Sequence, residues 1–188
     1  MTRYVVEEAR LEELASGLAP VTDGWFVVNV RDAAWETNDR GDAMCSFEGE
    51  SAPFADLGIS IRVLRPGRTT GLYHAESTQE DFLVLAGQCL LLVEGAERPL
   101  EAWDFVHCPP GTEHAFVATG EGPCIILMTG APRSSSARTI VYPRSDLALR
   151  HGVGVETETR SPRKAQSQLG ISPWSYRRPD DWDALPWA

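Results

Sequence analysis

The chain has 188 residues, of which 43% are hydrophobic and 23% charged, so wholesale disorder is excluded and one compact domain is expected. Its 27 acidic and 17 basic residues give a formal net charge of −10, which argues against nucleic acid or an anionic membrane as a partner. No apolar run approaches the ~20 residues of a spanning helix, and the start lacks the pattern of a secretory signal. The four cysteines form no CxxC pair, so we expect reduced thiols in a cytoplasmic protein.

The first two predicted elements precede the main strand block. Residues 5–14 place apolar side chains among Glu and Arg at the spacing of a short amphipathic helix. Residues 24–30 are rich in aromatic and branched side chains, which favours a strand.

The middle of the chain has a different pattern. Short apolar runs, each ended by Gly or Pro, occupy residues 59–64, 82–86, 89–93, 105–108, 115–118 and 124–128. Runs of this length and spacing predict an antiparallel sandwich or barrel. No helix-period segment interrupts them, which argues against a parallel α/β sheet.

The last part of the chain is more polar. Residues 139–142 suggest one more strand, residues 144–150 a helical turn, and residues 156–168 a polar, partly mobile segment. The tail that follows holds Trp174, Trp182 and Trp187 among prolines. It either packs on its own barrel, which would bury the aromatic rings, or crosses to a neighbouring subunit. The sequence leaves both arrangements open.

Four side chains in two segments carry the chemistry. Residues two apart on a strand share a face, so His74 and Glu76 should project together, with Glu80 joining them after a short bend. His114 follows a Pro-Gly turn, where the next strand begins. Two imidazoles with one or two carboxylates suit a divalent transition metal such as Fe(II), and Mn, Ni, Zn or Co would be accepted as well.

The spacing of these residues resembles the cupin superfamily, whose motifs are G(x)5HxH(x)3,4E(x)6G and G(x)5PxGxxH(x)3N. Glu80 is followed by six residues and then Gly87, and residues 109–114 match the core of the second motif. The resemblance covers about residues 57–130. It implies an all-β fold, a double-stranded β-helix or jelly-roll barrel, with one metal ion held by His74, Glu80 and His114 plus the residue at position 76.

The chain departs from both motifs. Glu76 replaces the second histidine of the first motif, while Trp103 and Ala118 replace the glycine and the asparagine of the second. Glu76 is interpreted as a fourth metal ligand that strengthens hard-cation binding, or as a group that binds substrate or moves a proton.

The histidines also allow other interpretations. His74 and His114 could be hydrogen-bonded core histidines in a cupin without metal. A zinc site built from His107, Cys108 and His114 is disfavoured, because neighbouring strand residues face opposite ways; Cys108 is expected in the core. His151 is expected at the surface.

The sequence thus predicts residues 1–143 as a barrel with an N-terminal extension and residues 144–188 as a helical turn and Trp/Pro-rich tail. The predicted protein binds one divalent metal (Fe, Mn, Zn or Ni) and acts on or binds a small polar molecule. A dioxygenase-like oxidoreductase is one hypothesis; a metal-dependent sugar isomerase or epimerase and a non-catalytic ligand-binding module are the others. No catalytic residue is assigned, and the family resemblance implies a homodimer.

Overall fold

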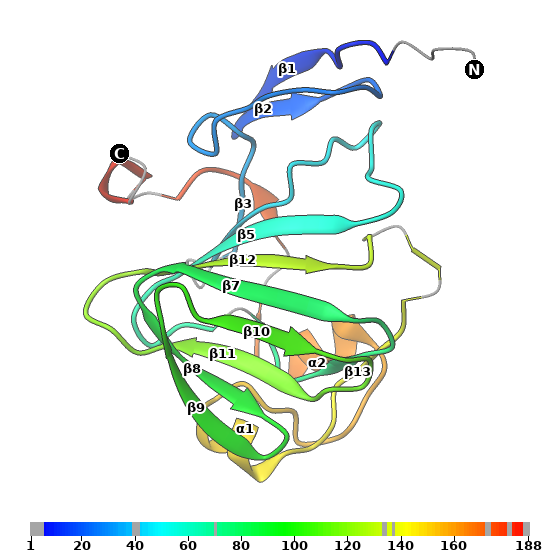
Figure 1. Cartoon of the computed structure of the whole chain (residues 1–188). Coiled ribbons are helices and arrows are strands. Elements are labelled where there is room, and N and C mark those ends of the chain that lie inside the picture. The colour runs from blue at the N-terminus through cyan, green and yellow to red at the C-terminus, as the bar shows by residue number, and fades with distance from the viewer. Residues whose placement is uncertain are drawn as a thin grey trace.

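The computed structural model describes residues 6–38, 42–69, 71–132, 135–136, 138–171, 174–179 and 182–185. Two antiparallel sheets pack face to face as a barrel (Figure 1). The larger sheet has the strand order β10 (Phe105–Cys108), β7 (Glu80–Ala86), β12 (Cys124–Gly130), β5 (Gly58–Leu64), β4 (Ala43–Cys45), β3 (Glu36–Thr37) and β14 (Ser175–Tyr176). The smaller sheet has the order β11 (His114–Ala118), β8 (Gln88–Val93) and β9 (Ala96–Glu101). Two short pairs are β1 (Leu11–Leu14) with β2 (Gly17–Pro20) and β13 (Ile140–Val141) with β6 (Ala75–Glu76).

The main core lies between the two sheets and follows the two-residue alternation of strands. In β11, Phe116 points inward, whereas Ala115 and Val117 pack outward in a separate cluster. The inner cluster collects side chains from both sheets, namely Leu64, Phe82, Val84, Cys89, Leu91, Cys108, Phe116, Ala118, Cys124 and Ile126. The apolar runs of the middle segment are therefore strands of one barrel, as the sequence predicted.

Helix α1 (Asp146–Arg150) covers the outer face of the smaller sheet. Its Leu147 and Ala148 pack with Leu92 and Val117, which makes both faces of β11 buried. The Ser145 side chain caps the helix by accepting a hydrogen bond from the Ala148 amide at 3.3 Å. The predicted helical turn and the short strand before it, β13, are both confirmed.

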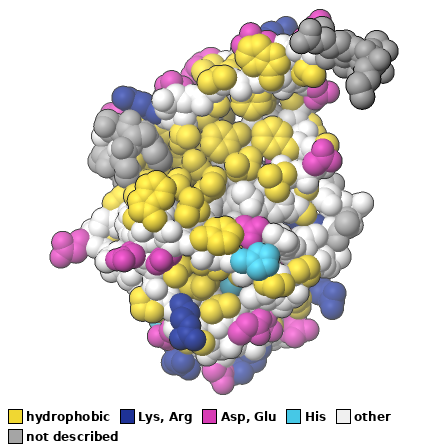
Figure 2. All heavy atoms as spheres, viewed as in Figure 1, with side chains coloured by type: hydrophobic (Ala, Val, Ile, Leu, Met, Phe, Trp, Pro, Cys, Tyr) yellow, Lys and Arg dark blue, Asp and Glu magenta, His cyan; other side chains and the backbone are white. Residues whose placement is uncertain are grey.

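The outer face of the larger sheet carries a second apolar cluster. Trp182, in the short 3₁₀ helix η1 (Trp182–Ala184), packs edge-on against Trp35 with ring centroids 5.1 Å apart. Here the tail packs on the barrel of its own chain; Trp187 lies outside the described residues. Figure 2 shows further hydrophobic side chains gathered over this face. The homodimer implied by the family resemblance stays a prediction.

Helix α2 (Pro162–Gln168) was not expected from the sequence. Its start is set by Ser161, which accepts a hydrogen bond from the Lys164 amide, and by Pro162 in the first turn. Only Ala165 is buried, so the segment has no apolar periodicity to reveal it. Ala165 packs with Tyr142 beside the cavity described below.

Two predictions at the N-terminus were wrong. Within the expected helix 5–14, the described residues form an extended segment and strand β1, which pairs with β2. The reason is that so short a helix is marginal in water, whereas the backbone groups of β1 and β2 pair with each other in the hairpin. Residues 24–30 are not a strand either: only Trp25 forms a bridge, to Glu8, while Val28 and Val30 pack on the sheet without pairing.

Strand β9 was also missed. It contains Pro99 and three exposed charged residues, a composition that argues against a central strand. Its place at the edge of the smaller sheet explains this, because an edge strand can lack one amide donor. No helix among the described residues is long and apolar enough to cross a membrane.

Candidate metal centre

His74 and His114 lie side by side because their backbones pair. The His74 amide donates to the His114 carbonyl at 3.1 Å, and the His114 amide donates to the His74 carbonyl at 2.8 Å. The two imidazole centroids are 4.8 Å apart. The Pro-Gly turn contributes to this placement, since the Gly111 amide, at φ 88°, donates to the Glu76 carbonyl at 2.7 Å.

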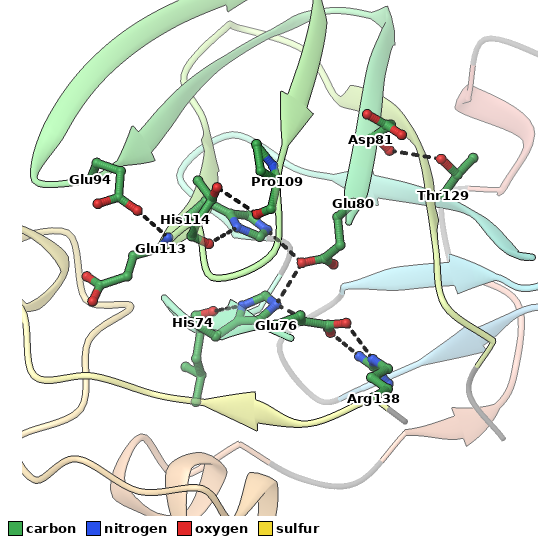
Figure 3. Close-up of polar contacts among 12 residues, drawn as sticks. His74, Glu76, Glu80, Asp81, Glu94, Pro109, Glu113, His114, Thr129 and Arg138 are labelled. Atoms are coloured by element: carbon green, nitrogen blue, oxygen red, sulfur yellow. Dashed lines mark hydrogen bonds and ion pairs between the residues drawn. The ribbon is translucent and has the colours of Figure 1, made fainter. Parts of the chain in front are cut away.

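Glu80 approaches the two rings from the start of β7, on the opposite sheet (Figure 3). Its Oε2 is 3.6 Å from Nε2 of His114 and 4.0 Å from Nε2 of His74. The ligand atoms of His74, Glu80 and His114 all lie within 4.8 Å of one another. Three donors from separate elements therefore converge on one point.

Hydrogen bonds fix the orientation of both rings. Nδ1 of His74 lies 2.7 Å from the Leu72 carbonyl, and Nδ1 of His114 lies 3.0 Å from the Thr112 carbonyl. A carbonyl can only accept, so each Nδ1 carries the proton and each Nε2 presents a lone pair. Such a second hydrogen bond is usual for histidines that bind metals.

Burial sets the charge of the three groups. It lowers the pKa of His74 to about 4, with the neighbouring His114 adding to the effect, and it also lowers the pKa of His114. Burial, reinforced by the Glu76 carboxylate, raises the pKa of Glu80 to about 8. The imidazoles are thus neutral at pH 7, and a cation bound by Glu80 would take the place of its proton.

Glu76 reaches the same cavity but has a different partner. Its Oε1 is 3.7 Å from Nε2 of His74. Both of its carboxylate oxygens accept hydrogen bonds from Arg138, Oε2 from Nε at 2.6 Å and Oε1 from Nη2. Arg138 was missed by sequence reasoning, because it lies 62 residues further along the chain in a segment without a motif.

The remaining histidines lie apart from this cluster. His107 is exposed and its Nδ1 lies 2.6 Å from Asp81, whereas Cys108 is buried in the main core. Adjacent residues of β10 face opposite ways, as predicted. His151, expected at the surface, is partly buried, and its Nε2 lies 2.8 Å from Oε1 of Glu97, whose side chain is about half exposed.

The cluster lines a cavity with two lobes. The inner lobe, about 200 Å³, is bordered by His74, Glu76, Glu80 and His114 together with the rings of Phe82 and Phe116. The outer lobe, about 390 Å³, adjoins it and shares the wall that contains Arg62, Arg138, Tyr142 and Trp174. Gln166 and Trp174 come from the C-terminal part of the chain, whose role in the cavity the sequence did not reveal.

The comparisons with known proteins agree with this architecture. Residues 60–130 match the family model of the cupin domain. The family resemblance inferred from the motifs and the all-β barrel are thereby confirmed. No curated protein matches the chain.

Three solved structures illustrate the likeness in fold. A cupin-superfamily sugar phosphate isomerase from Silicibacter pomeroyi is 16% identical, with 72% of this chain and 93% of that chain covered and a TM-score of 0.53. An RmlC-like cupin from Shewanella frigidimarina is 19% identical, with coverage of 60% and 95% and a TM-score of 0.50. KdgF from a Halomonas species is 22% identical, with coverage of 60% and 97% and a TM-score of 0.50.

Proposed function

We propose that His74, Glu80 and His114, in the segment that matches the cupin domain, bind one divalent transition-metal ion that serves in a reaction on a small polar molecule. The observation that carries this proposal is the convergence of the three ligand atoms within 4.8 Å of one another. Iron, manganese, zinc and nickel all accept such a donor set.

The donor set favours an oxidoreductase. Two histidines and one carboxylate are the ligands of many non-haem Fe(II) oxygenases, in which further coordination positions stay open. When bound, the ion would supply Lewis acidity or a redox centre. His74 and His114 present neutral Nε2 atoms to it, Glu80 supplies the negative charge, and the rings of Phe82 and Phe116 form an apolar part of the wall.

A metal-dependent isomerase acting on a sugar-like substrate is the second candidate. It is supported by Tyr142, whose ring centroid is 5.9 Å from that of His74 and which lines both lobes. Burial raises the pKa of Tyr142 to about 12, so its phenol keeps a proton that it can donate to a substrate oxygen.

Metal analysis tests the site itself. The purified protein is loaded with each metal, desalted, and subjected to elemental analysis, alongside the variants His114→Ala and Glu80→Gln. His107→Ala is the matched control, because it removes an exposed imidazole outside the cluster. We expect one ion per chain in the wild type and control and a clear loss in both site variants, with circular dichroism confirming that they fold. Equal metal content in all four proteins would overturn the proposed site.

Activity assays separate the candidate reactions. Oxygen uptake by the Fe(II)-loaded protein with a panel of small acids and sugars would support the oxidoreductase. Turnover under nitrogen with Zn(II), Ni(II) or Mn(II) would support the isomerase instead. Substrate binding without turnover by any metal form would identify a binding module and contradict both enzyme assignments.

A further inference from the structure

Arg138 and Glu76 form a second functional unit beside the metal ligands. We propose that Arg138 binds an anionic group of the substrate, a carboxylate or a phosphate, and that Glu76 orients Arg138 instead of binding the metal. The inference deepens the proposed function, on which it rests for the position of the metal.

Arg138 uses only one edge of its guanidinium to bind Glu76. Nε and Nη2 face Glu76, whose side chain is almost fully buried and whose two oxygens both accept from this edge of the guanidinium. A guanidinium has five N–H donors in a fixed plane, so its other edge, formed by Nη1 and the second N–H of Nη2, remains for another acceptor. Among the described residues, no acceptor contacts Nη1 of Arg138.

Arg138 lies where a ligand in the cavity can reach it. Arg138 lines both lobes of the cavity, and its side chain is about one third exposed, so solutes can reach it. Its partner Glu76 lies 3.7 Å from Nε2 of His74. Figure 3 shows the guanidinium next to Glu76 on the side away from the His114 ring. A ligand held by Arg138 would therefore lie in the same cavity as the proposed metal ligands.

The inner lobe is lined by charged groups of both signs. Its charged lining groups are the carboxylates of Asp42, Glu76 and Glu80 and the guanidinium groups of Arg62 and Arg138; with Glu80 ionised to bind the metal, these groups carry −1 and the divalent cation brings the lobe to +1. Arg138 neutralises Glu76, and the guanidinium carbon of Arg62 lies 5.0 Å from the centre of the Trp174 ring. A metal-loaded lobe of this charge favours an anion.

The pairing also explains the carboxylate at position 76. Both buried oxygens of Glu76 accept hydrogen bonds from Arg138, and a metal ion bound by Glu76 would be repelled by the guanidinium charge beside it. Glu76 holds Arg138 without this cost. A carboxylate, unlike a histidine, can accept two parallel N–H bonds and so fix the plane of the guanidinium.

The test is anion binding by the metal-loaded protein, measured calorimetrically with acetate and inorganic phosphate as probes and acetamide as the uncharged match for acetate. Arg138→Gln should weaken the preferred anion at least about tenfold, since a charge-assisted bidentate contact is lost. Arg138→Lys should not restore the affinity, because an ammonium lacks the planar edge. Arg144→Gln is the matched control: it removes an equal charge from an exposed pair with Asp146.

Glu76→Gln distinguishes the orienting role from metal binding. We expect this variant to keep its metal, in contrast to Glu80→Gln, while its affinity for the anion falls. The proposal would be overturned if Arg138→Gln kept the anion affinity of the wild type, if acetamide bound tightly, or if the wild type bound neither anion. It would also be overturned if Glu76→Gln lost as much metal as Glu80→Gln. If the wild type binds no metal, the proposed function fails separately, and dependence of anion binding on Arg138 is then measured in the metal-free protein.

Discussion

His74 and His114 are joined as a two-way backbone pair, each donating its amide to the other's carbonyl, at 3.1 and 2.8 Å. The pair connects the segment before β6 to the start of β11, and it holds the two rings 4.8 Å apart before any metal is present. A site whose donors are held in place by backbone bonds needs little rearrangement to bind an ion, which leads to the first prediction.

Metal binding should stabilise the protein. A ligand that binds only the folded state at one hundred times its dissociation constant adds about 2.7 kcal/mol to the free energy of unfolding. We expect removal of the metal with a chelator to lower the melting temperature accordingly and re-addition to restore it, as measured by differential scanning calorimetry. His114→Ala should show no response to metal, whereas His151→Ala, which changes a residue paired with Glu97, should respond as the wild type does.

The metal-free protein should lose stability as the pH rises. Burial raises the folded-state pKa of Glu80 to about 8 from its ordinary 4.5, so the folded state holds this proton more tightly than the unfolded chain does. The contribution of protonated Glu80 is complete below pH 4.5 and declines as the pH rises through about 8, by at most about 1.4 kcal/mol per pH unit. Because His74 contributes in the opposite direction below pH 6.5, urea denaturation in the presence of a chelator should show this decline between pH 6.5 and about 8, and Glu80→Gln should flatten it.

His74 should act in the opposite direction at low pH. Its folded-state pKa is lowered from 6.5 to about 4, so its contribution to stability is present above pH 6.5 and is lost as the pH falls toward 4. Because Glu80→Gln leaves His74 in place, the acid limb of the profile should persist in that variant. A profile with equal slopes in wild type and variant above pH 5 would contradict the assigned burial of Glu80.

The packing of the tail predicts unequal costs for two tryptophans. Trp182→Ala should reduce the free energy of unfolding by about 3 kcal/mol, because the ring is buried against Trp35. Trp103→Ala should change it by no more than about 0.5 kcal/mol, since the Trp103 side chain is 76% exposed. Urea denaturation monitored by far-UV circular dichroism measures both; similar costs would show that the tail does not pack as described.

Two glycines with nearly equal backbone angles form another matched pair. Gly87, between β7 and β8, has φ 77°, and a Cβ added there would lie 2.3 Å from the Pro123 carbonyl oxygen. Gly95 has φ 75° and nothing within 4 Å of such a Cβ. Gly95→Ala should cost about 1 kcal/mol from the left-handed conformation alone, and Gly87→Ala clearly more, because the backbone must also move. Thermal denaturation measures the difference, and equal costs would contradict the close approach at Gly87.

The strands of the barrel were predictable because each apolar run ends at residues that favour a turn. Runs such as residues 82–86 and 89–93 are apolar, short and separated by a glycine whose left-handed backbone the turn requires. The N-terminus was not predictable in the same way. The pattern of residues 11–14 is compatible with a helix. These residues form a strand instead because they pair with residues 17–20, and the local pattern does not reveal that pairing.

The sequence predicted the three ligand residues of the candidate site but not the ion pair between Arg138 and Glu76. The spacing of His74, Glu80 and His114 is local information, and the structure brings all three together. The bond from Arg138 to Glu76 spans 62 residues and leaves no periodic trace in the sequence, so the role of Glu76 stayed open. Trp103 shows a related limit: it adopts φ 78°, a conformation suited to glycine, at the position where the family motif has glycine.

The wall of the cavity has a mixed origin. The proposed metal ligands belong to residues 60–130, the segment that matches the cupin domain. Gln166, Ile171 and Trp174, which also line the cavity, come from well beyond that segment. Substitutions in this outlying segment can therefore reshape the space available to a substrate while the imidazoles keep their backbone pairing. Over evolutionary time, such an arrangement lets relatives diverge in what they accept without rebuilding the centre where the chemistry takes place.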